Sequence, residues 1–142
     1  MKHFFWTIST LFAICASCFC LPALADNIVV IINKENNQQV TKEFITKVYL
    51  GKIGTWPDGS TVTAFDQAEE NPIHDKFYTE ILGKNPSLVK TIWTQNIFTG
   101  KRLPPKIANP DAEMIKLVSS NKNAIGYINA ANVDGSIKVI TP

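Results

Sequence analysis

The pattern of apolar and polar positions predicts short strands alternating with amphipathic helices. The β-branched run at residues 28–32 is too short for a helix and predicts a strand buried on both faces. Apolar residues recur at spacings of three and four in residues 41–50, which predicts an amphipathic helix capped by Thr41. Gly51 suits the left-handed position after that helix. Partial alternation at residues 61–65 predicts a second strand.

Between this helix and this strand, the chain carries a tryptophan and a tight turn. Pro57, Asp58 and Gly59 have the chemistry of a turn, because proline fixes φ and glycine allows a positive φ. We expect Trp56 to pack its ring over the end of the core rather than to contact a ligand. The segment is therefore predicted to be structural.

Three further helices are predicted to begin with an asparagine cap followed by proline at the first helical position. A proline-stiffened loop at residues 101–106 precedes the third helix, and residues 124–128 and 137–140 predict two last strands. The order β-α-β-α-α-α-β-β predicts a single α/β domain with an open mixed sheet flanked by helices. The three asparagine–proline pairs are Asn71-Pro72, Asn85-Pro86 and Asn109-Pro110.

The N-terminal segment, residues 1–25, has the organisation of a secretory signal peptide. A short basic region is followed by an apolar stretch at residues 4–21 and a small-residue cleavage site at residues 23–25. Cleavage would leave a domain at residues 26–142 with no membrane span. All three cysteines lie inside the signal, so the mature domain would contain no disulfide and no cysteine-based metal site.

Composition gives little support to enzymatic or nucleic-acid functions. The chain has 14 basic and 12 acidic residues, and loss of Lys2 leaves 13 against 12, so no strong charge attracts nucleic acid or an anionic membrane. His74 is the single histidine of the mature domain, and no G-x-S-x-G elbow, Walker loop, dinucleotide fingerprint or zinc spacing occurs. The carboxylates Asp66, Glu69 and Glu70 lack the ligand spacing of a calcium site. We therefore expect no catalytic residues, no metal and no cofactor.

The loop between Asp66 and Lys76 leaves a strand and enters a helix, which makes it the candidate binding site. Ligands bind beyond the carboxyl ends of strands in open α/β sheets, and a helix N-terminus offers free N–H groups to an anion. The alternative interpretation is an ordinary capped helix on the surface, beside two glutamates that repel phosphate. The predicted ligand-binding residues are Gln67, Asn71, Ile73 (through its backbone N–H), His74 and Lys76.

Two motifs carry a resemblance to a known family. Residues 48–56 resemble the IF-x-GK-I-x-x-W segment of the periplasmic phosphate-binding proteins of ABC transporters, and residues 123–128 resemble the GAIGY strand of that family. The resemblance implies a periplasmic-binding-protein-like fold of the type II class, a periplasmic location, and phosphate or a related small oxyanion as ligand. The mature length is similar to that of small members with a single lobe.

The chain departs from the family at the anion loop. Gln67 stands near a position where the family has arginine, and Asn71 stands near a serine position. Loss of a charge-assisted contact costs about 1.5–3 kcal/mol. The alternative function is therefore a degenerate receptor lobe that acts as a protein-interaction module of the cell envelope. Its candidate surface comprises Trp93, Phe98, Lys101 and Arg102.

Overall fold

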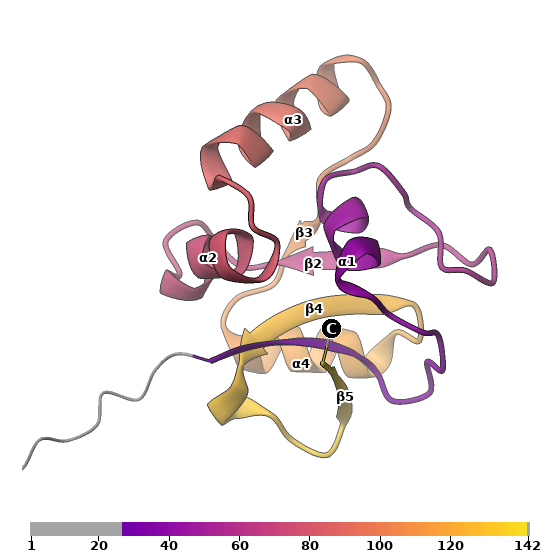
Figure 1. Cartoon of the computed structure of the whole chain (residues 1–142). Coiled ribbons are helices and arrows are strands. Elements are labelled where there is room, and N and C mark those ends of the chain that lie inside the picture. Colours follow the sequence, from indigo (N-terminus) through magenta and orange to yellow (C-terminus); the bar gives the residue numbers. More distant parts are fainter. Residues whose placement is uncertain (1–26, 142) are drawn as a thin grey trace, which may run out of the picture.

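The computed structural model describes residues 27–141 (Figure 1). It contains a five-stranded sheet and four α-helices, and α2 continues directly into a π-helical turn, η1. The strands are β1 (Ile28–Asn33), β2 (Thr63–Asp66), β3 (Lys106–Ile107), β4 (Ala124–Asn129) and β5 (Ile137–Ile140). The helices are α1 (Lys42–Tyr49), α2 (Pro72–Lys76), η1 (Phe77–Ile81), α3 (Pro86–Phe98), α4 (Asp111–Ser120) and the short 3₁₀ turn η2 (Ala130–Asn132).

The sheet is open and mixed, as the order of elements predicts. Its strand order is β3-β2-β4-β1-β5. Strand β2 runs parallel to both β3 and β4, whereas β1 runs antiparallel to β4 and β5. The carboxyl ends of β2, β3 and β4 therefore meet at one edge of the sheet, which is where α/β proteins place their ligands.

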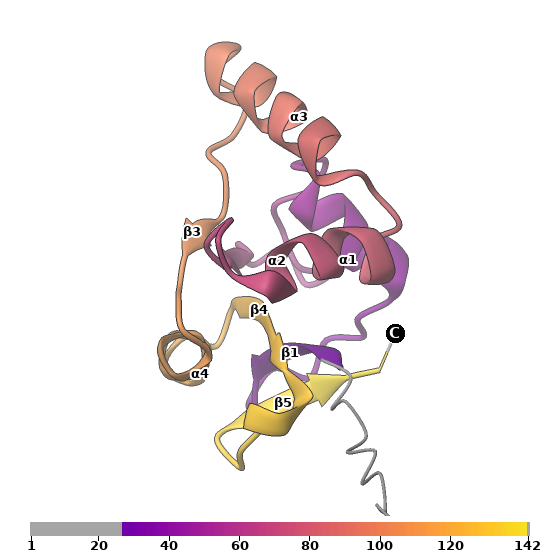
Figure 2. The ribbon, with the colours of Figure 1, turned by 90° about the vertical axis from the view of Figure 1, so that its left-hand side faces the viewer.

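Helices cover both faces of the sheet, as Figure 2 shows, with α4 on one side and α1 and α2 on the other. Alternation along β4 separates two cores: Ile125 and Tyr127 pack with α1 and η1, whereas Ala124 and Ile128 pack with α4. Gly126 lets α4 approach closely, because an added Cβ would lie 2.4 Å from the Met114 sulfur. Strand β1 also contributes side chains to both cores, so it is buried on both faces, as predicted.

The predicted structural roles around the first helix are confirmed. The Thr41 hydroxyl oxygen accepts a hydrogen bond from the Phe44 N–H at 3.1 Å, and Gly51 has a φ of 69°. Trp56 is 2% exposed, stacks on the Phe44 ring with centroids 5.0 Å apart, and donates its indole N–H to the Asn123 carbonyl at 3.0 Å. This tryptophan closes the core from the side of the turn.

Two predictions about the later part of the chain are wrong in detail. Asn109 does not cap α4: the cap position is Pro110, no side chain caps the helix, and the Asn109–Pro110 peptide bond is cis. The Asn109 side chain instead accepts a hydrogen bond from the Asn71 side chain at 2.8 Å. The loop expected at residues 101–106 ends in β3, a two-residue strand that pairs with β2. The predicted signal peptide lies outside the described residues.

Candidate functional site

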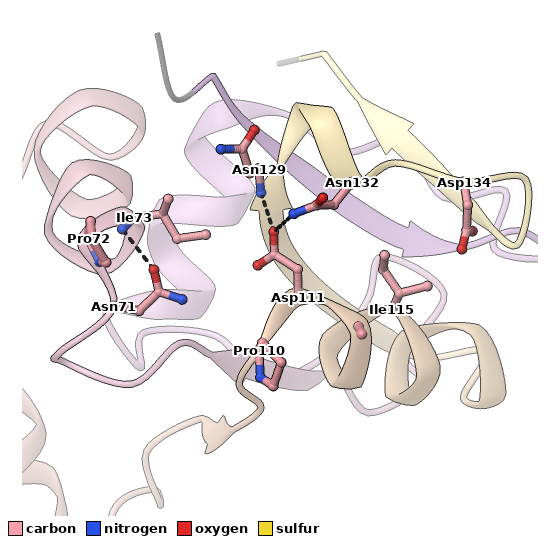
Figure 3. A pocket seen from close by; sticks show the side chains of 10 residues that line it. Asn71, Pro72, Ile73, Pro110, Asp111, Ile115, Asn129, Asn132 and Asp134 are labelled. Atoms are coloured by element: carbon pink, nitrogen blue, oxygen red, sulfur yellow. Dashed lines mark hydrogen bonds between the residues drawn. The ribbon is translucent and has the colours of Figure 1, made fainter. Parts of the chain in front are cut away.

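A cavity of about 720 Å³ opens at the carboxyl edge of the sheet, and we refer to it as the carboxyl-edge cavity (Figure 3). It lies between the starts of α2 and α4, beside the end of β4 and the η2 turn. Parallel strands end here and two helices begin here, so the topology itself creates the hollow. The lining residues are Asn71, Pro72, Ile73, Pro110, Asp111, Ala112, Ile115, Asn129, Asn132 and Asp134.

Asp111 is the central polar residue of this cavity. Its side chain is fixed by three donors that come from different elements of the fold. One carboxylate oxygen accepts from the Gln67 side-chain amide at 2.9 Å. The other accepts from the backbone N–H of Asn129 at 2.9 Å and from the Asn132 side chain at 2.8 Å, as the dashed lines in Figure 3 show. Asp111 is 9% exposed, so a preoriented carboxylate forms part of the cavity wall.

Gln67 and Asn71, two of the predicted site residues, are joined directly. The Asn71 side-chain amide donates to the Gln67 side-chain oxygen at 3.1 Å. Asn71 lines the carboxyl-edge cavity, whereas Gln67 is fully buried behind Asp111. Gln67 therefore supports the Asp111 carboxylate and does not itself face this cavity.

The backbone N–H groups that the sequence offers to an anion are already bonded within the protein. The Ile73 N–H donates to the Asn71 side-chain oxygen at 3.1 Å, and the His74 N–H donates to the Asn71 carbonyl at 2.9 Å. At the start of α4, by contrast, no side chain caps the helix. Within residues 27–141, the N–H groups of Asp111 and Ala112 have no hydrogen-bond acceptor. The free donors thus belong to α4 and not to α2.

His74 does not line the carboxyl-edge cavity. It lines a second cavity, of about 330 Å³, together with Gln67, Asp66, Tyr78 and Trp93. Its Nε2 atom is 3.9 Å from a carboxylate oxygen of Asp66, and its Nδ1 atom is 2.8 Å from Asp75. Lys76 is not among the residues that line either cavity. The structure therefore places Asn71 and Ile73 at one cavity and Gln67 and His74 at the other, and it does not bring the five predicted residues into one site.

A buried cluster of three tyrosines around Asp66 holds the end of β2 in place. The hydroxyl groups of Tyr78 and Tyr127 both donate to the Asp66 carboxylate, the former at 2.6 Å, and Tyr49 donates to the Phe65 carbonyl at 2.7 Å. Burial, reinforced by the charge of Asp66, raises the pKa of all three hydroxyls well above the usual value. This cluster is a structural support from which Gln67 extends toward Asp111.

The charge around the carboxyl-edge cavity is acidic. Asp111 and Asp134 line it, and no lysine, arginine or histidine is among its lining residues. The sequence patterns alone do not point to Asp111, Asn129, Asn132 or Asp134 as residues of this site. A signal for Asp111 does exist, since an acidic residue directly after proline is typical of a first helical turn, but only the topology places that turn beside β4.

These features define the class of the protein: it is a single-lobe α/β domain with a periplasmic-binding-protein-like fold. Solved structures of substrate-binding proteins of phosphate ABC transporters share this fold. One from Clostridium perfringens, described as a putative phosphate transporter substrate-binding protein with bound phosphate, is 25% identical, with a TM-score of 0.65 over 81% of this chain and 44% of that one.

Two further solved structures show the same fold. An ABC-type phosphate transport receptor from Vibrio cholerae is 19% identical, with a TM-score of 0.62 over 81% of this chain and 45% of its own. PstS from Borrelia burgdorferi is 14% identical, with a TM-score of 0.63 over 82% of this chain and 47% of its own. The chain thus spans less than half the length of these transport receptors. No protein-family profile and no curated sequence matches the chain.

The described helices bear on two further expectations, a membrane span and a surface for a protein partner. Between residues 27 and 141, none of the helices has the length and apolar character needed to cross a bilayer. On the expected interaction surface, Phe98 is 92% exposed at the end of α3, whereas Trp93 is half-buried. The similar solved structures are described as transport substrate-binding proteins, and they give no support to an envelope protein as partner.

Proposed function

We propose that the protein is a substrate-binding lobe that holds a small oxyanion, phosphate in the first instance, in the carboxyl-edge cavity. The observation that carries this proposal is the position of the cavity, which lies beyond the ends of parallel strands and at the uncapped start of α4. Unpaired N–H groups at a helix start attract anions. The phosphate bound to the Clostridium perfringens neighbour supports the choice of ligand.

Asp111 determines which oxyanion suits the cavity. A carboxylate repels a fully deprotonated anion but accepts a hydrogen bond from an anion that retains a proton. Phosphate retains a proton near neutral pH, whereas sulfate does not. We therefore propose that the lobe prefers phosphate to sulfate, with Asp111 as the acceptor and the N–H groups of Asp111 and Ala112 as donors.

The residues predicted from sequence take different parts in this proposal. Asn71 and Ile73 lie at the cavity itself, and Gln67 acts from behind by fixing the Asp111 carboxylate. His74 and Lys76 lie outside the lining of the cavity, so their contribution would be indirect, through the orientation of α2. The binding role of each residue is therefore testable on its own.

Calorimetric titration with phosphate and with sulfate, at low salt and neutral pH, tests the proposal. We expect heat of binding with phosphate and a much weaker response with sulfate. Asp111→Asn removes the negative charge of the acceptor and should reduce the difference in affinity between phosphate and sulfate. Glu113→Gln is the matched control, since Glu113 lies on the same helical turn and is not among the lining residues.

Three outcomes would contradict the proposal. The first is the absence of both heat and a thermal shift at millimolar phosphate. The second is equal binding of phosphate and sulfate by the wild-type protein, and the third is an equal effect of Asp111→Asn and Glu113→Gln. The proposal also includes export to the periplasm and association with an ABC transporter. N-terminal sequencing of the exported protein should then give Asp26 as the first residue.

A further inference from the structure

The only arginine of the chain, Arg102, lies in a cavity on another part of the molecule. This cavity has a volume of about 400 Å³ and lies between the end of α1, helix α3 and the loop that returns from α3 to β3, a loop that can be followed in Figure 1. We call it the Arg102 cavity. It shares none of its lining residues with the carboxyl-edge cavity, so an inference about it is independent of the proposed function.

The Arg102 guanidinium lies against a glycine. An added Cβ on Gly54 would lie 1.7 Å from a terminal guanidinium nitrogen of Arg102, so the guanidinium rests directly against the Gly54 backbone. Within residues 27–141, Arg102 has no acidic or carbonyl partner. The donors of this guanidinium are therefore available to an anion that enters the cavity.

The remaining lining gives the cavity a cationic end and an apolar body. Lys106 is the second cation, and no aspartate or glutamate is among the lining residues. Val48, Trp93 and Leu103 are among the apolar residues that line it. Trp93 is fixed in turn, because its indole N–H donates to the Tyr49 carbonyl at 2.9 Å. The carboxyl-edge cavity, with Asp111 and Asp134, has the opposite charge.

We propose that the Arg102 cavity is a second binding site, which takes a small organic anion with an oxyanion head on an aromatic or branched apolar body. The head would be held by the guanidinium fork of Arg102 and by Lys106, and the body would lie against Trp93. Inorganic phosphate alone leaves the apolar part of this cavity unfilled. The two cavities therefore differ in the class of ligand that they accept.

Titration of the protein with benzoate and with phenyl phosphate tests this site. The indole N–H signals of Trp56 and Trp93 are monitored by NMR during each titration. We expect both ligands to shift the Trp93 signal and to leave the Trp56 signal unchanged, because Trp56 is bonded to the Asn123 carbonyl on another side of the core. Acetate carries the charge without the apolar body, and benzyl alcohol carries the body without the charge. Both should bind at least about tenfold more weakly than benzoate.

Gly54→Ala is the decisive variant, because it removes no charge. The new methyl group must displace the end of the Arg102 side chain, which is flexible, and Gly54 does not have a positive φ that would strain alanine. We expect Gly54→Ala and Arg102→Gln each to weaken benzoate binding by at least about tenfold. Gly135→Ala and Lys101→Gln are the matched controls, since a Cβ at Gly135 meets open space and Lys101 is not among the lining residues.

Several results would overturn the assignment. They are the absence of binding by either aromatic anion, acetate or benzyl alcohol binding as tightly as benzoate, and a shift of the Trp56 signal in place of the Trp93 signal. Benzoate affinity that is unchanged in both Gly54→Ala and Arg102→Gln would overturn it as well. Circular dichroism of each variant shows whether the fold is retained, so that a loss of binding can be assigned to the cavity.

Discussion

The three tyrosines around Asp66 predict how the fold responds to alkaline pH. Tyr49, Tyr78 and Tyr127 are the only tyrosines of the chain, and each is less than 3% exposed. Burial first, and the charge of Asp66 second, raise the pKa of each hydroxyl in the folded protein well above the value of about 10 that tyrosine has in an unfolded chain. Folding therefore keeps all three hydroxyls protonated at a pH where the unfolded chain releases those protons.

The sign and size of the effect follow from linkage. Above about pH 10 the folded state binds more protons than the unfolded state, so the free energy of unfolding falls as pH rises, by about 1.4 kcal/mol per pH unit for each tyrosine. Three tyrosines give a slope of about 4 kcal/mol per pH unit. A domain stable by about 5–15 kcal/mol would then unfold within about one to four pH units above pH 10. Below pH 10 this contribution to stability is fully present.

The assay follows tyrosinate absorbance and circular dichroism on the same samples during an alkaline titration. We expect tyrosinate to appear only as the circular dichroism signal is lost, in one cooperative transition. Tyr49→Phe removes one of the three groups and should reduce the slope of stability against pH by about a third. Tyrosinate that forms near pH 10 while the circular dichroism stays native would refute the burial argument, since it would show that at least one hydroxyl titrates in the folded state.

Two further predictions concern stability and are checked by urea unfolding. Thr41→Ala removes the acceptor of the Phe44 N–H and should lower the free energy of unfolding by about 1 kcal/mol, whereas Thr41→Ser should retain most of it. Gly126→Ala places a methyl group against the buried Met114 side chain and should cost about 1–3 kcal/mol. An unchanged unfolding midpoint in either alanine variant would contradict the effect on stability that we expect from the corresponding contact.

Local signals were enough to predict most of the fold. The hydrophobic period gives α1, the β-branched run gives β1, and the cap at Asn85 starts α3 where the sequence places it. The asparagine at position 109 looks the same in sequence but bonds to Asn71, which lies 38 residues away along the chain. Strand β3 was missed because two residues are too few to produce a pattern. Its pairing with β2 depends on tertiary contacts alone.

The candidate site was predicted less completely, because it is assembled across the topology. The sequence correctly places Asn71 at the carboxyl edge of the sheet, since that residue lies at the end of the loop that joins β2 to α2. Asp111 enters the same cavity from a helix some 40 residues later, and its partners Asn129 and Asn132 follow another strand. No local window contains these residues together. The strand order, which brings β2 beside β4, decides the composition of the site.

The departure at position 67 has a physical meaning that only the structure reveals. Where the resembling family has an arginine, a buried neutral amide here bridges Asn71 and the Asp111 carboxylate, with hydrogen bonds of 3.1 and 2.9 Å. An arginine there would neutralise Asp111, whereas glutamine leaves the negative charge facing the cavity. Gln67→Ala should therefore release the Asp111 side chain without adding charge, and Gln67→Arg should remove the acidic character of the cavity. The neutral side chain at this position thus links the divergence in sequence to the preference for a protonated anion that we propose.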